Sequence, residues 1–209
     1  MSRPSRVGLL DYGSGNLHSA RRALEATGAE VLVSSDSAAF DSCDGLVVPG
    51  VGAFAACMAG LVSVGGDDLV TSWIERGRQL LGICVGHQIL FETGVEHGIR
   101  TSGLGILPGT VERLDAERLP HMGWNTVQPP PDSTLFEGLA SERFYFVHSY
   151  GVHAADGLGA GVRVTTATHG GDTFVAACEA PSVTSTQFHP EKSGEAGARL
   201  LSRWVATLL

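Results

Sequence analysis

The feature that most constrains this chain is a cysteine flanked by glycines, between an apolar run and a helix-like segment. Residues 79–83 form the apolar run and are predicted to be a buried strand, while residues 89–91 indicate a helix that opens after Cys84. Between them, Gly82-x-Cys84-x-Gly86 follows the nucleophile-elbow pattern G-x-S-x-G, with sulfur in place of oxygen. The pattern predicts a sharp strand-to-helix turn that presents the thiol.

The two glycines have a steric role in such a turn. A sharp strand-to-helix turn leaves no room for side chains two positions before and after the nucleophile. The turn also directs the thiol toward the N-terminus of the next helix, where backbone N–H groups and the helix dipole favour a thiolate. The alternative is a structural cysteine beside incidental glycines, since the chain has 28 of them. Two further motifs, described below, favour the nucleophile.

Length and composition narrow the class of protein. A chain of 209 residues is predicted to form one domain, residues 1–209. A hydrophobic content of 43% with 17% charged residues excludes a disordered chain. The formal net charge of -8 argues against nucleic acid or an anionic membrane as the main partner. No internal repeat is visible.

The cysteines and the first residues bear on the compartment. No C-x-x-C pair occurs, which argues against a disulfide framework or a zinc site and predicts a reducing, cytoplasmic environment. The four cysteines are Cys43, Cys57, Cys84 and Cys178. The basic residues 1–6 precede only a short apolar run, so no signal peptide is expected. The uncharged stretch 45–66 contains Pro49 and six glycines, which favours strand, loop and helix over a membrane span.

The first half of the chain alternates predicted strands and helices. Such alternation implies βαβ units and a parallel sheet, whose sites lie beyond the carboxyl ends of the strands. The predicted strands are 7–10, 30–34, 45–48 and 79–83, and the helices start near residues 17, 53 and 67, with Asp67 as a predicted N-cap. The glycine-rich run 49–54 follows a strand and is either an ordinary turn or an oxyanion hole built from unencumbered N–H groups.

The second half of the chain has a different residue pattern. After about Gly98, short alternating runs rich in β-branched and aromatic residues predict strands, and Gly170-Gly171 predicts a hairpin turn. These runs are 104–114, 121–127, 143–153, 161–168, 173–179 and 183–188. An amphipathic pattern near residues 200–208 predicts a last helix. The fold class is therefore α/β, with a largely parallel central sheet flanked by helices and a β-rich second half.

A histidine and a glutamate two residues apart complete a possible catalytic set. Pro190 restricts His189 to an extended conformation, in which residues two apart share a face. Glu191 then holds the imidazole, and the imidazole faces a thiol supplied from elsewhere in the fold. The alternative is a solvated surface pair.

These motifs together resemble the class I glutamine amidotransferases, and within that family the glutaminase subunits of imidazole glycerol phosphate synthases. The family resemblance rests on Pro49-Gly50-Val51-Gly52, Gly82-Ile83-Cys84-Val85-Gly86-His87-Gln88 and Gln187-Phe188-His189-Pro190-Glu191. The subunit resemblance adds Asp11-Tyr12-Gly13-x-Gly15-Asn16-Leu17, Pro120-His121-Met122-Gly123-Trp124-Asn125, Tyr145-Phe146-Val147-His148-Ser149-Tyr150 and Glu191-Lys192-Ser193. His87 departs from the pattern, since these subunits more often carry methionine there.

The resemblance implies glutamine hydrolysis through a thioester, with ammonia passed to a (β/α)₈ synthase subunit in a heterodimer. It implies catalytic roles for Cys84, His189 and Glu191, and no metal, organic cofactor, nucleic acid or membrane. The implied oxyanion and substrate-binding positions are Val51, Gly52, Val85, Gln88, His148, Ser149 and Tyr150. The implied positions facing the partner are Asn16, Trp124, Tyr145 and Lys192.

Three alternatives remain open on the sequence. The first is a subunit of another amidotransferase, feeding anthranilate, pyridoxal phosphate or purine synthesis, against which the run 120–125 argues. The second is a stand-alone cysteine hydrolase or peptidase, against which Gln88 and the run 187–191 argue. The third is a binding module without activity, which the intact Cys84, His189 and Glu191 disfavour.

Overall fold

The computed structural model describes residues 3–153 and 158–208 and is built around a seven-stranded sheet. Its strand order is β11-β12-β13-β4-β3-β1-β2. The strands are β1 (Arg6–Leu10), β2 (Glu30–Ser34), β3 (Gly45–Gly50), β4 (Gln79–Cys84), β11 (Arg163–His169), β12 (Asp172–Glu179) and β13 (Val183–Thr186). From β2 to β13 neighbouring strands are parallel, and β12 and β11 extend the sheet in antiparallel fashion.

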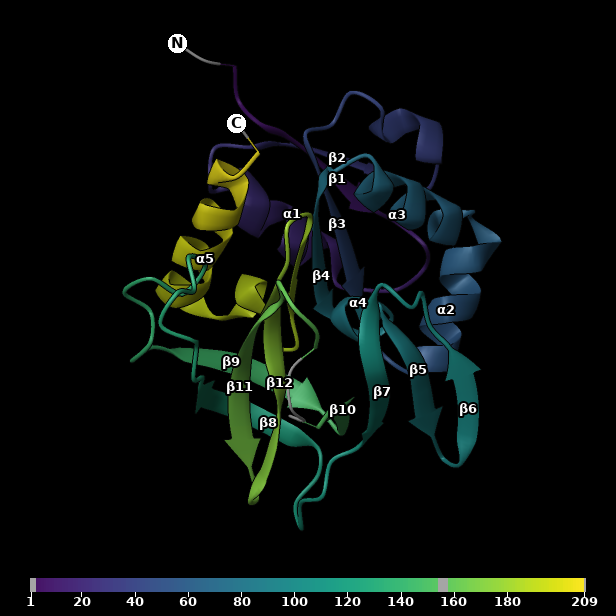
Figure 1. Ribbon diagram of the computed structural model, residues 1–209. Helices are drawn as coiled ribbons and strands as arrows, with labels where there is room; N and C mark the ends of the chain where they lie inside the picture. Colours follow the sequence, from purple (N-terminus) through teal and green to yellow (C-terminus); the bar gives the residue numbers. More distant parts are fainter. Residues whose placement is uncertain (1–2, 154–157, 209) are drawn as a thin grey trace.

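Helices cover both faces of this sheet, as Figure 1 shows. On one face lie α1 (Leu17–Glu25) and α5 (Gly194–Ala206), and on the other α2 (Phe54–Ser63) and α3 (Gly66–Glu75). The apolar side chains of β3 and β4 are fully enclosed between these layers. Strands buried on both faces require near-continuous apolar runs, which is what both segments carry.

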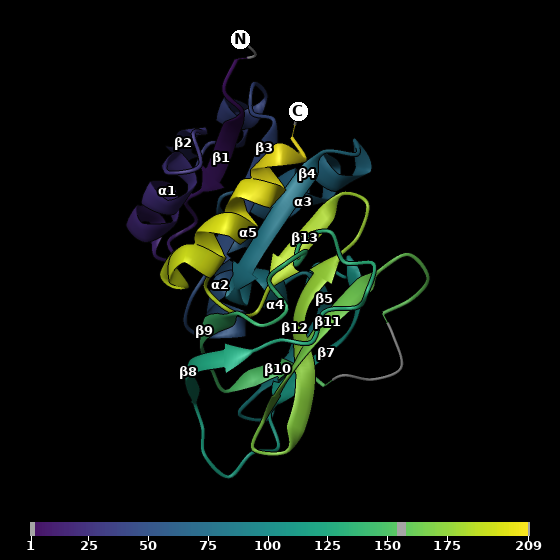
Figure 2. The same cartoon turned by 90° about the vertical axis from the view of Figure 1, so that its left-hand side faces the viewer.

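Smaller sheets lie beyond the carboxyl ends of the parallel strands, in both views (Figures 1 and 2). One has the order β10-β7-β5-β6, and the other pairs β8 with β9. Their bounds are β5 (Phe91–Glu96), β6 (Ile99–Ser102), β7 (Leu107–Arg113), β8 (His121–Thr126), β9 (Arg143–His148) and β10 (Tyr150–Val152). These small sheets lie over the end of the large sheet at which β4 finishes in Cys84.

The predicted fold class is confirmed, as are the four parallel strands of the first half and the strand-rich second half. The two-residue turn at Gly170-Gly171 is also confirmed, because His169 pairs with Asp172 across β11 and β12. The uncharged stretch 45–66 folds as β3, a loop and α2, as expected. None of the described helices is by itself both long and apolar enough to span a membrane; only α2 and α3 taken together, bent by 84°, meet that criterion.

Three local predictions were wrong. The helix after Cys84 is a single turn, α4 (Val85–Gln88), and Phe91 already begins β5. The strand-rich part therefore starts before Gly98, because Phe91 is needed in the second sheet, where it pairs with Leu107. Asp67 is not an N-cap but lies in the first turn of α3, where its charge suits the helix dipole.

The turn at Cys84 depends on an exceptionally close approach of two backbones. A Cβ at Gly86 would lie 1.9 Å from the Val48 carbonyl oxygen of β3, and one at Gly82 would lie 2.7 Å from the Gly86 carbonyl oxygen. A Cβ at Gly50 would lie 2.5 Å from the Gly86 nitrogen. Backbone atoms of neighbouring strands have little freedom to move aside, so these three positions accept only glycine.

We expect Gly86→Ala to lower the free energy of unfolding by about 3 kcal/mol, because the added methyl group overpacks a rigid site. Urea denaturation followed by circular dichroism measures the change. Gly151→Ala in β10 is the matched control, since its Cβ would meet no atom closer than 3.4 Å. Equal stability of the two variants would contradict the steric account of the elbow.

Candidate active site

Cys84 lies at the junction of β4 and α4 in a strained conformation. Its φ of 56° and ψ of -112° fall in a region that residues other than glycine rarely adopt. Its side chain is only 3% exposed, and its sulfur accepts a hydrogen bond from Gln187 Nε2 at 3.9 Å. The predicted elbow is therefore present, and the structure holds the thiol in a fixed direction.

The helix that follows Cys84 is too short to act through a macrodipole. α4 has four residues, so the dipole predicted to favour a thiolate is small. What remains is local: Val85 opens the helix, and its N–H has no acceptor four residues earlier within it. Electrostatic stabilisation of a thiolate therefore has to come from single N–H groups and from the neighbouring imidazole, and not from the helix dipole.

His189 and Glu191 form a buried pair beside the cysteine. His189 Nδ1 donates to Glu191 Oε1 at 2.8 Å, and the two side chains are 2% and 4% exposed. Burial lowers the pKa of His189, but the Cys84 thiol and the Glu191 carboxylate outweigh it and raise that pKa to about 9. The other ring nitrogen, Nε2, is buried and has no hydrogen-bond partner among the described residues. It is the atom left for proton transfer.

The route to this pair differs from the one that the sequence predicted. His189 is extended, with φ of -100° and ψ of 95°, but Glu191 lies in the 3₁₀ turn η2 (Pro190–Lys192) and not on a strand. The turn brings the carboxylate back beneath the imidazole. The His189 backbone is fixed on both sides, since its N–H donates to the Tyr145 carbonyl and its carbonyl accepts from Ser193 Oγ.

Cys84 and His189 line one cavity of about 200 Å³. Its lining includes seven predicted oxyanion and substrate positions: Val51, Gly52, Val85, Gln88, His148, Ser149 and Tyr150. It also carries one carboxylate, Glu96, and one ammonium group, Lys192. A cavity with both charges next to a thiol suits a zwitterionic amino acid whose side chain reaches the sulfur.

Two of these contributors had not been predicted. Glu96 ends β5, and its Oε2 accepts a hydrogen bond from the Phe54 N–H at the start of α2, which fixes the carboxylate at the cavity wall. Gln187 bridges the sulfur and Gln88, whose Nε2 donates to Gln187 Oε1 at 2.9 Å. Nothing in the sequence around Glu96 indicates that it belongs to the site, whereas Gln187 is part of the motif at residues 187–191.

A chain of histidines fixes the far wall of the cavity. His148 Nδ1 donates to the Tyr150 carbonyl at 2.9 Å, so its Nε2 accepts, here from His121 Nδ1 at 3.1 Å. Asn125 Nδ2 in turn donates to His121 Nε2. Burial lowers the pKa of His148 to about 3 and that of His121 to about 4, so both rings are neutral at pH 7. The chain positions the Ser149–Tyr150 backbone and supplies no charge.

His87 lies apart from this chemistry. It is fully buried, its Nδ1 lies 2.7 Å from Ser185 Oγ, and its ring meets Phe91 edge-on at 5.1 Å. Burial lowers its pKa to about 3. These contacts make it a packed residue of the first helical turn.

The four positions predicted to face a partner have different structural roles. Asn16 caps α1, its Oδ1 accepting from the Ser19 N–H at 3.2 Å. Trp124 is 52% exposed and meets Tyr145 edge-on across β8 and β9. Lys192 lines the cavity itself. Met122, on the same face of β8 as Trp124, is 62% exposed and extends an apolar patch that had not been predicted.

The family model described as "Glutamine amidotransferase class-I" matches residues 8–207, nearly the whole described chain. This chain belongs to the class I glutamine amidotransferase family. A solved structure described as "Crystal structure of glutamine amidotransferase" has a TM-score of 0.74 at 25% identity and covers 97% of each chain. A structure described as "Structure of PurLQS from Thermotoga maritima" has a TM-score of 0.75 at 20% identity over 100% of both chains, which supports the fold alone.

Similar relatives carry a more specific name. A protein of Cutibacterium acnes named "Imidazole glycerol phosphate synthase subunit HisH" is 62% identical over 208 residues, covering 100% of both chains. A relative of the same name from Corynebacterium glutamicum is 57% identical over 204 residues, with 95% of this chain and 97% of its own length covered.

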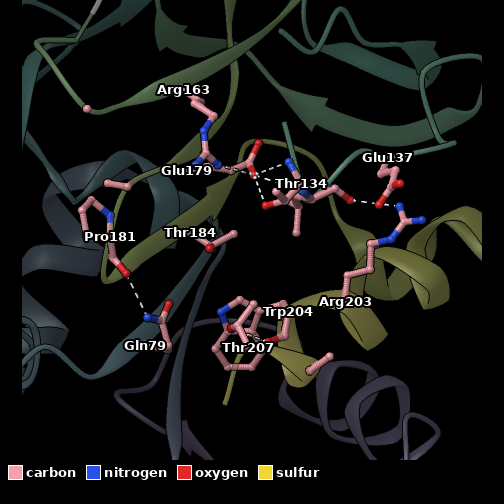
Figure 3. A pocket seen from close by; sticks show the side chains of 14 residues that line it. Gln79, Thr134, Glu137, Arg163, Glu179, Pro181, Thr184, Arg203, Trp204 and Thr207 are labelled. Carbon is pink, nitrogen blue, oxygen red and sulfur yellow. Dashed lines mark hydrogen bonds and ion pairs between the residues drawn. The ribbon is translucent and has the colours of Figure 1, made fainter. Parts of the chain in front are cut away.

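A larger cavity, of about 430 Å³, lies beside Gln79 at the start of β4, the end of that strand opposite Cys84. Figure 3 shows the side chains that line it. Two of its charged side chains are engaged with each other: Arg163 Nη1 meets Glu179 Oε2 at 3.3 Å, and the same oxygen accepts from the Thr134 and Leu135 N–H groups. This cluster ties the proline-rich loop that begins at residue 129 to β12. Size alone therefore does not mark the active site in this protein.

We expect Glu191→Gln to lower the pKa of His189 from about 9 toward its ordinary value, because the amide keeps a hydrogen bond but removes the negative charge. A raised pKa stabilises the fold below the unfolded value and loses that contribution as pH rises through 9, so the variant also loses this alkaline transition. NMR titration of ¹⁵N-histidine-labelled protein measures the shift. Glu195→Gln, an exposed residue of α5, is the control and should leave His189 unchanged.

Proposed function

We propose that this chain is the glutaminase subunit of an imidazole glycerol phosphate synthase in histidine biosynthesis. The observation that carries the proposal is the meeting of Cys84, His189 and Glu191 at one cavity that holds a carboxylate and an ammonium group. The names of the similar relatives support the choice of synthase among the family's many activities.

In the first step the Cys84 thiolate attacks the carboxamide carbon of glutamine. The sulfur–carbon bond forms as the carbonyl oxygen takes the negative charge, and the tetrahedral intermediate then expels ammonia to leave a thioester. His189 Nε2 supplies the proton that the departing nitrogen needs. The raised pKa of His189 suits this step, because the ring carries its proton at neutral pH.

In the second step water hydrolyses the thioester. His189, now neutral, takes a proton from water as it attacks, and the products are glutamate and the free thiolate. Glu191 holds Nδ1–H throughout, so Nε2 remains the working atom. Glu96 suits the α-ammonium group of glutamine and Lys192 its α-carboxylate, while Gln88, Ser149 and Tyr150 line the space between.

The charge on the carbonyl oxygen requires donors near Cys84. We assign these to the Val85 N–H and to the backbone of Val51 and Gly52, because Gly50 pairs with Cys84 in the sheet and delivers that loop beside the sulfur. A single oxyanion donor is worth roughly 3 kcal/mol of transition-state stabilisation. The orientation of this loop therefore controls the rate.

Ammonia has to reach a second active site before it escapes. We propose that the acceptor is a (β/α)₈ subunit bound as a heterodimer, which converts a phosphoribulosyl formimino carboxamide nucleotide into imidazole glycerol phosphate and an aminoimidazole carboxamide ribotide. The exposed apolar patch of Met122 and Trp124 favours the mouth of the cavity as the docking side. Four free cysteines favour a reducing, cytoplasmic location.

We expect Cys84→Ala to abolish glutamine-dependent product formation by the complex, because no other described group can form the thioester. Product formation from added ammonium salt should persist, since that chemistry belongs to the partner. Co-purification with the candidate synthase subunit, followed by both assays, makes the measurement. Glutamine-dependent turnover without Cys84 would falsify its role as the nucleophile. A stand-alone hydrolase, or the subunit of another amidotransferase, would not co-purify with the candidate synthase subunit.

We expect Trp124→Ala to weaken partner binding roughly tenfold or more, as removal of a central interface aromatic commonly does. Glutamine hydrolysis by the isolated chain should stay at its starting rate, because Trp124 lies outside the cavity lining. Surface plasmon resonance against the synthase subunit gives the affinity. Ile99→Ala on β6, 66% exposed and away from β8, is the control. Unchanged affinity for Trp124→Ala would move the interface elsewhere.

A further inference from the structure

The segment that carries His189 brings a second polar side chain to the sulfur of Cys84. Gln187 lies two residues before His189, and residues two apart in an extended segment share a face. Phe188, between them, packs instead against Phe144, with ring centroids 4.4 Å apart. The Gln187 side chain is fully buried, and its Nε2 lies 3.9 Å from the Cys84 sulfur. One short segment therefore supplies both the imidazole and an amide to the nucleophile.

The orientation of the Gln187 amide is determined by Gln88. A buried amide can turn either its oxygen or its nitrogen toward the sulfur, and its hydrogen-bond partners decide which. Gln88 Nε2 donates to the Tyr150 carbonyl oxygen at 2.8 Å and to Gln187 Oε1 at 2.9 Å. Because a backbone carbonyl group can only accept, the nitrogen of Gln88 has to face Tyr150, and its second hydrogen is left for Gln187. The oxygen of Gln187 therefore faces Gln88, and its NH₂ group faces the sulfur.

The Tyr150 carbonyl group that sets this direction is itself fixed. Its oxygen also accepts from His148 Nδ1 at 2.9 Å, so both of its lone pairs are used. The hydrogen bonds continue through His121 to Asn125, whose Oδ1 accepts from the Thr126 N–H at 2.9 Å. The network thus has a backbone acceptor near the sulfur and a backbone donor at its far end. Neither end allows an amide or an imidazole to be reversed.

A donor in this position favours the ionised form of the cysteine. A neutral thiol is a weak hydrogen-bond acceptor, whereas hydrogen bonds to a charged group are shorter and stronger. An N–H group beside the sulfur therefore stabilises the thiolate more than the thiol. The same holds when the thioester breaks, because the electron pair of the carbon–sulfur bond returns to the sulfur. The N–H is then in place for the leaving thiolate.

We propose that Gln187 is a further catalytic residue, whose amide N–H stabilises the Cys84 thiolate both as nucleophile and as leaving group. Gln88 acts on the sulfur through Gln187 and is in this respect a positioning residue. The inference rests on the proposed function for the reaction that the thiolate performs, but the ionisation of the sulfur can be measured without glutamine. Gln187 is not part of the cavity lining, so in this account it does not contact the substrate.

The test measures alkylation of Cys84 by iodoacetamide in the full-length chain, from the mass of the peptide that carries this residue. Cys84 lines the cavity, and only its thiolate reacts with the reagent. Gln187→Met keeps the length of the side chain and removes the donor. We expect it to slow alkylation at pH 7 roughly tenfold, as loss of a hydrogen bond to a charged group commonly does. As pH rises, the two rates should converge, because both thiols are then ionised.

The pH profile reports on the contact with Gln187 because the other titratable groups around the sulfur stay in place. These groups are Tyr12, Cys57, Glu96, His189, Glu191 and Lys192. In the same variant kcat/KM for glutamine should fall by a similar factor. The inhibition constant of the product glutamate should stay within about twofold, since the lining of the cavity is unchanged.

Three further variants make the result specific. Gln187→Asn keeps an amide but shortens the side chain, and should also slow alkylation at pH 7. Gln79→Met is the matched control, because Gln79 Nε2 donates to the Pro181 carbonyl at 2.9 Å, at the other end of β4, and its loss should leave alkylation unchanged. Gln88→Met should slow alkylation, and combining it with Gln187→Met should add nothing, since Gln88 acts through Gln187.

Two results would overturn the proposal. One is alkylation at the unmodified rate at pH 7 in Gln187→Met or Gln187→Asn protein whose circular dichroism is unchanged. The other is slowing by the same factor at every pH, which indicates altered access to the sulfur and not altered ionisation. Additive effects of the Gln88 and Gln187 substitutions would remove the positioning role of Gln88. Glutamine hydrolysis that survives in Cys84→Ala overturns the proposed function instead, so the two failures are distinguishable.

Discussion

The contact on which this structure depends is the one between the Gly86 backbone and the Val48 carbonyl group. It allows the first turn of α4 to sit directly on β3, where any side chain would collide with the neighbouring strand. That approach turns the chain sharply enough to hold Cys84 at positive φ. The nucleophile is therefore fixed by backbone packing in the centre of the sheet and not by a flexible loop.

The other groups of the site are delivered by strands that neighbour this point. β3 ends at Gly50, which pairs with Cys84, and β13 lies on the other side of β4 and leads into Gln187 and His189. The loop at residues 51–53 and the imidazole thus flank the sulfur because the strand order places them there. The small sheets close the cavity from beyond the strand ends, with Glu96 at the end of β5 and Ser149 between β9 and β10.

Much of this could be predicted because it is local. The elbow glycines, the run at residues 189–191 and the strand–helix alternation are each visible in a short stretch of sequence, although the atom that requires Gly86 to be a glycine is the Val48 carbonyl oxygen of β3. The length of α4 could not be predicted, since Phe91 leaves the helix only because Leu107 offers it a partner in another sheet. The hydrogen bond from the Phe54 N–H to Glu96 and the one from Gln187 to the Cys84 sulfur join distant segments, and no periodicity in the sequence indicates them. The contact between Glu191 and His189 was predicted for the wrong reason. A 3₁₀ turn, and not an extended segment, brings the carboxylate to the imidazole.

The presence of Lys192 in the cavity lining has a practical consequence, because the chain contains no other lysine. Apart from the terminal amine, a reagent that acylates primary amines has a single target, at the mouth of the catalytic cavity. The rate at which that one group reacts reports directly on whether the mouth is open, filled or covered. The protein thus carries a built-in chemical reporter, usable in mixtures and without an engineered label.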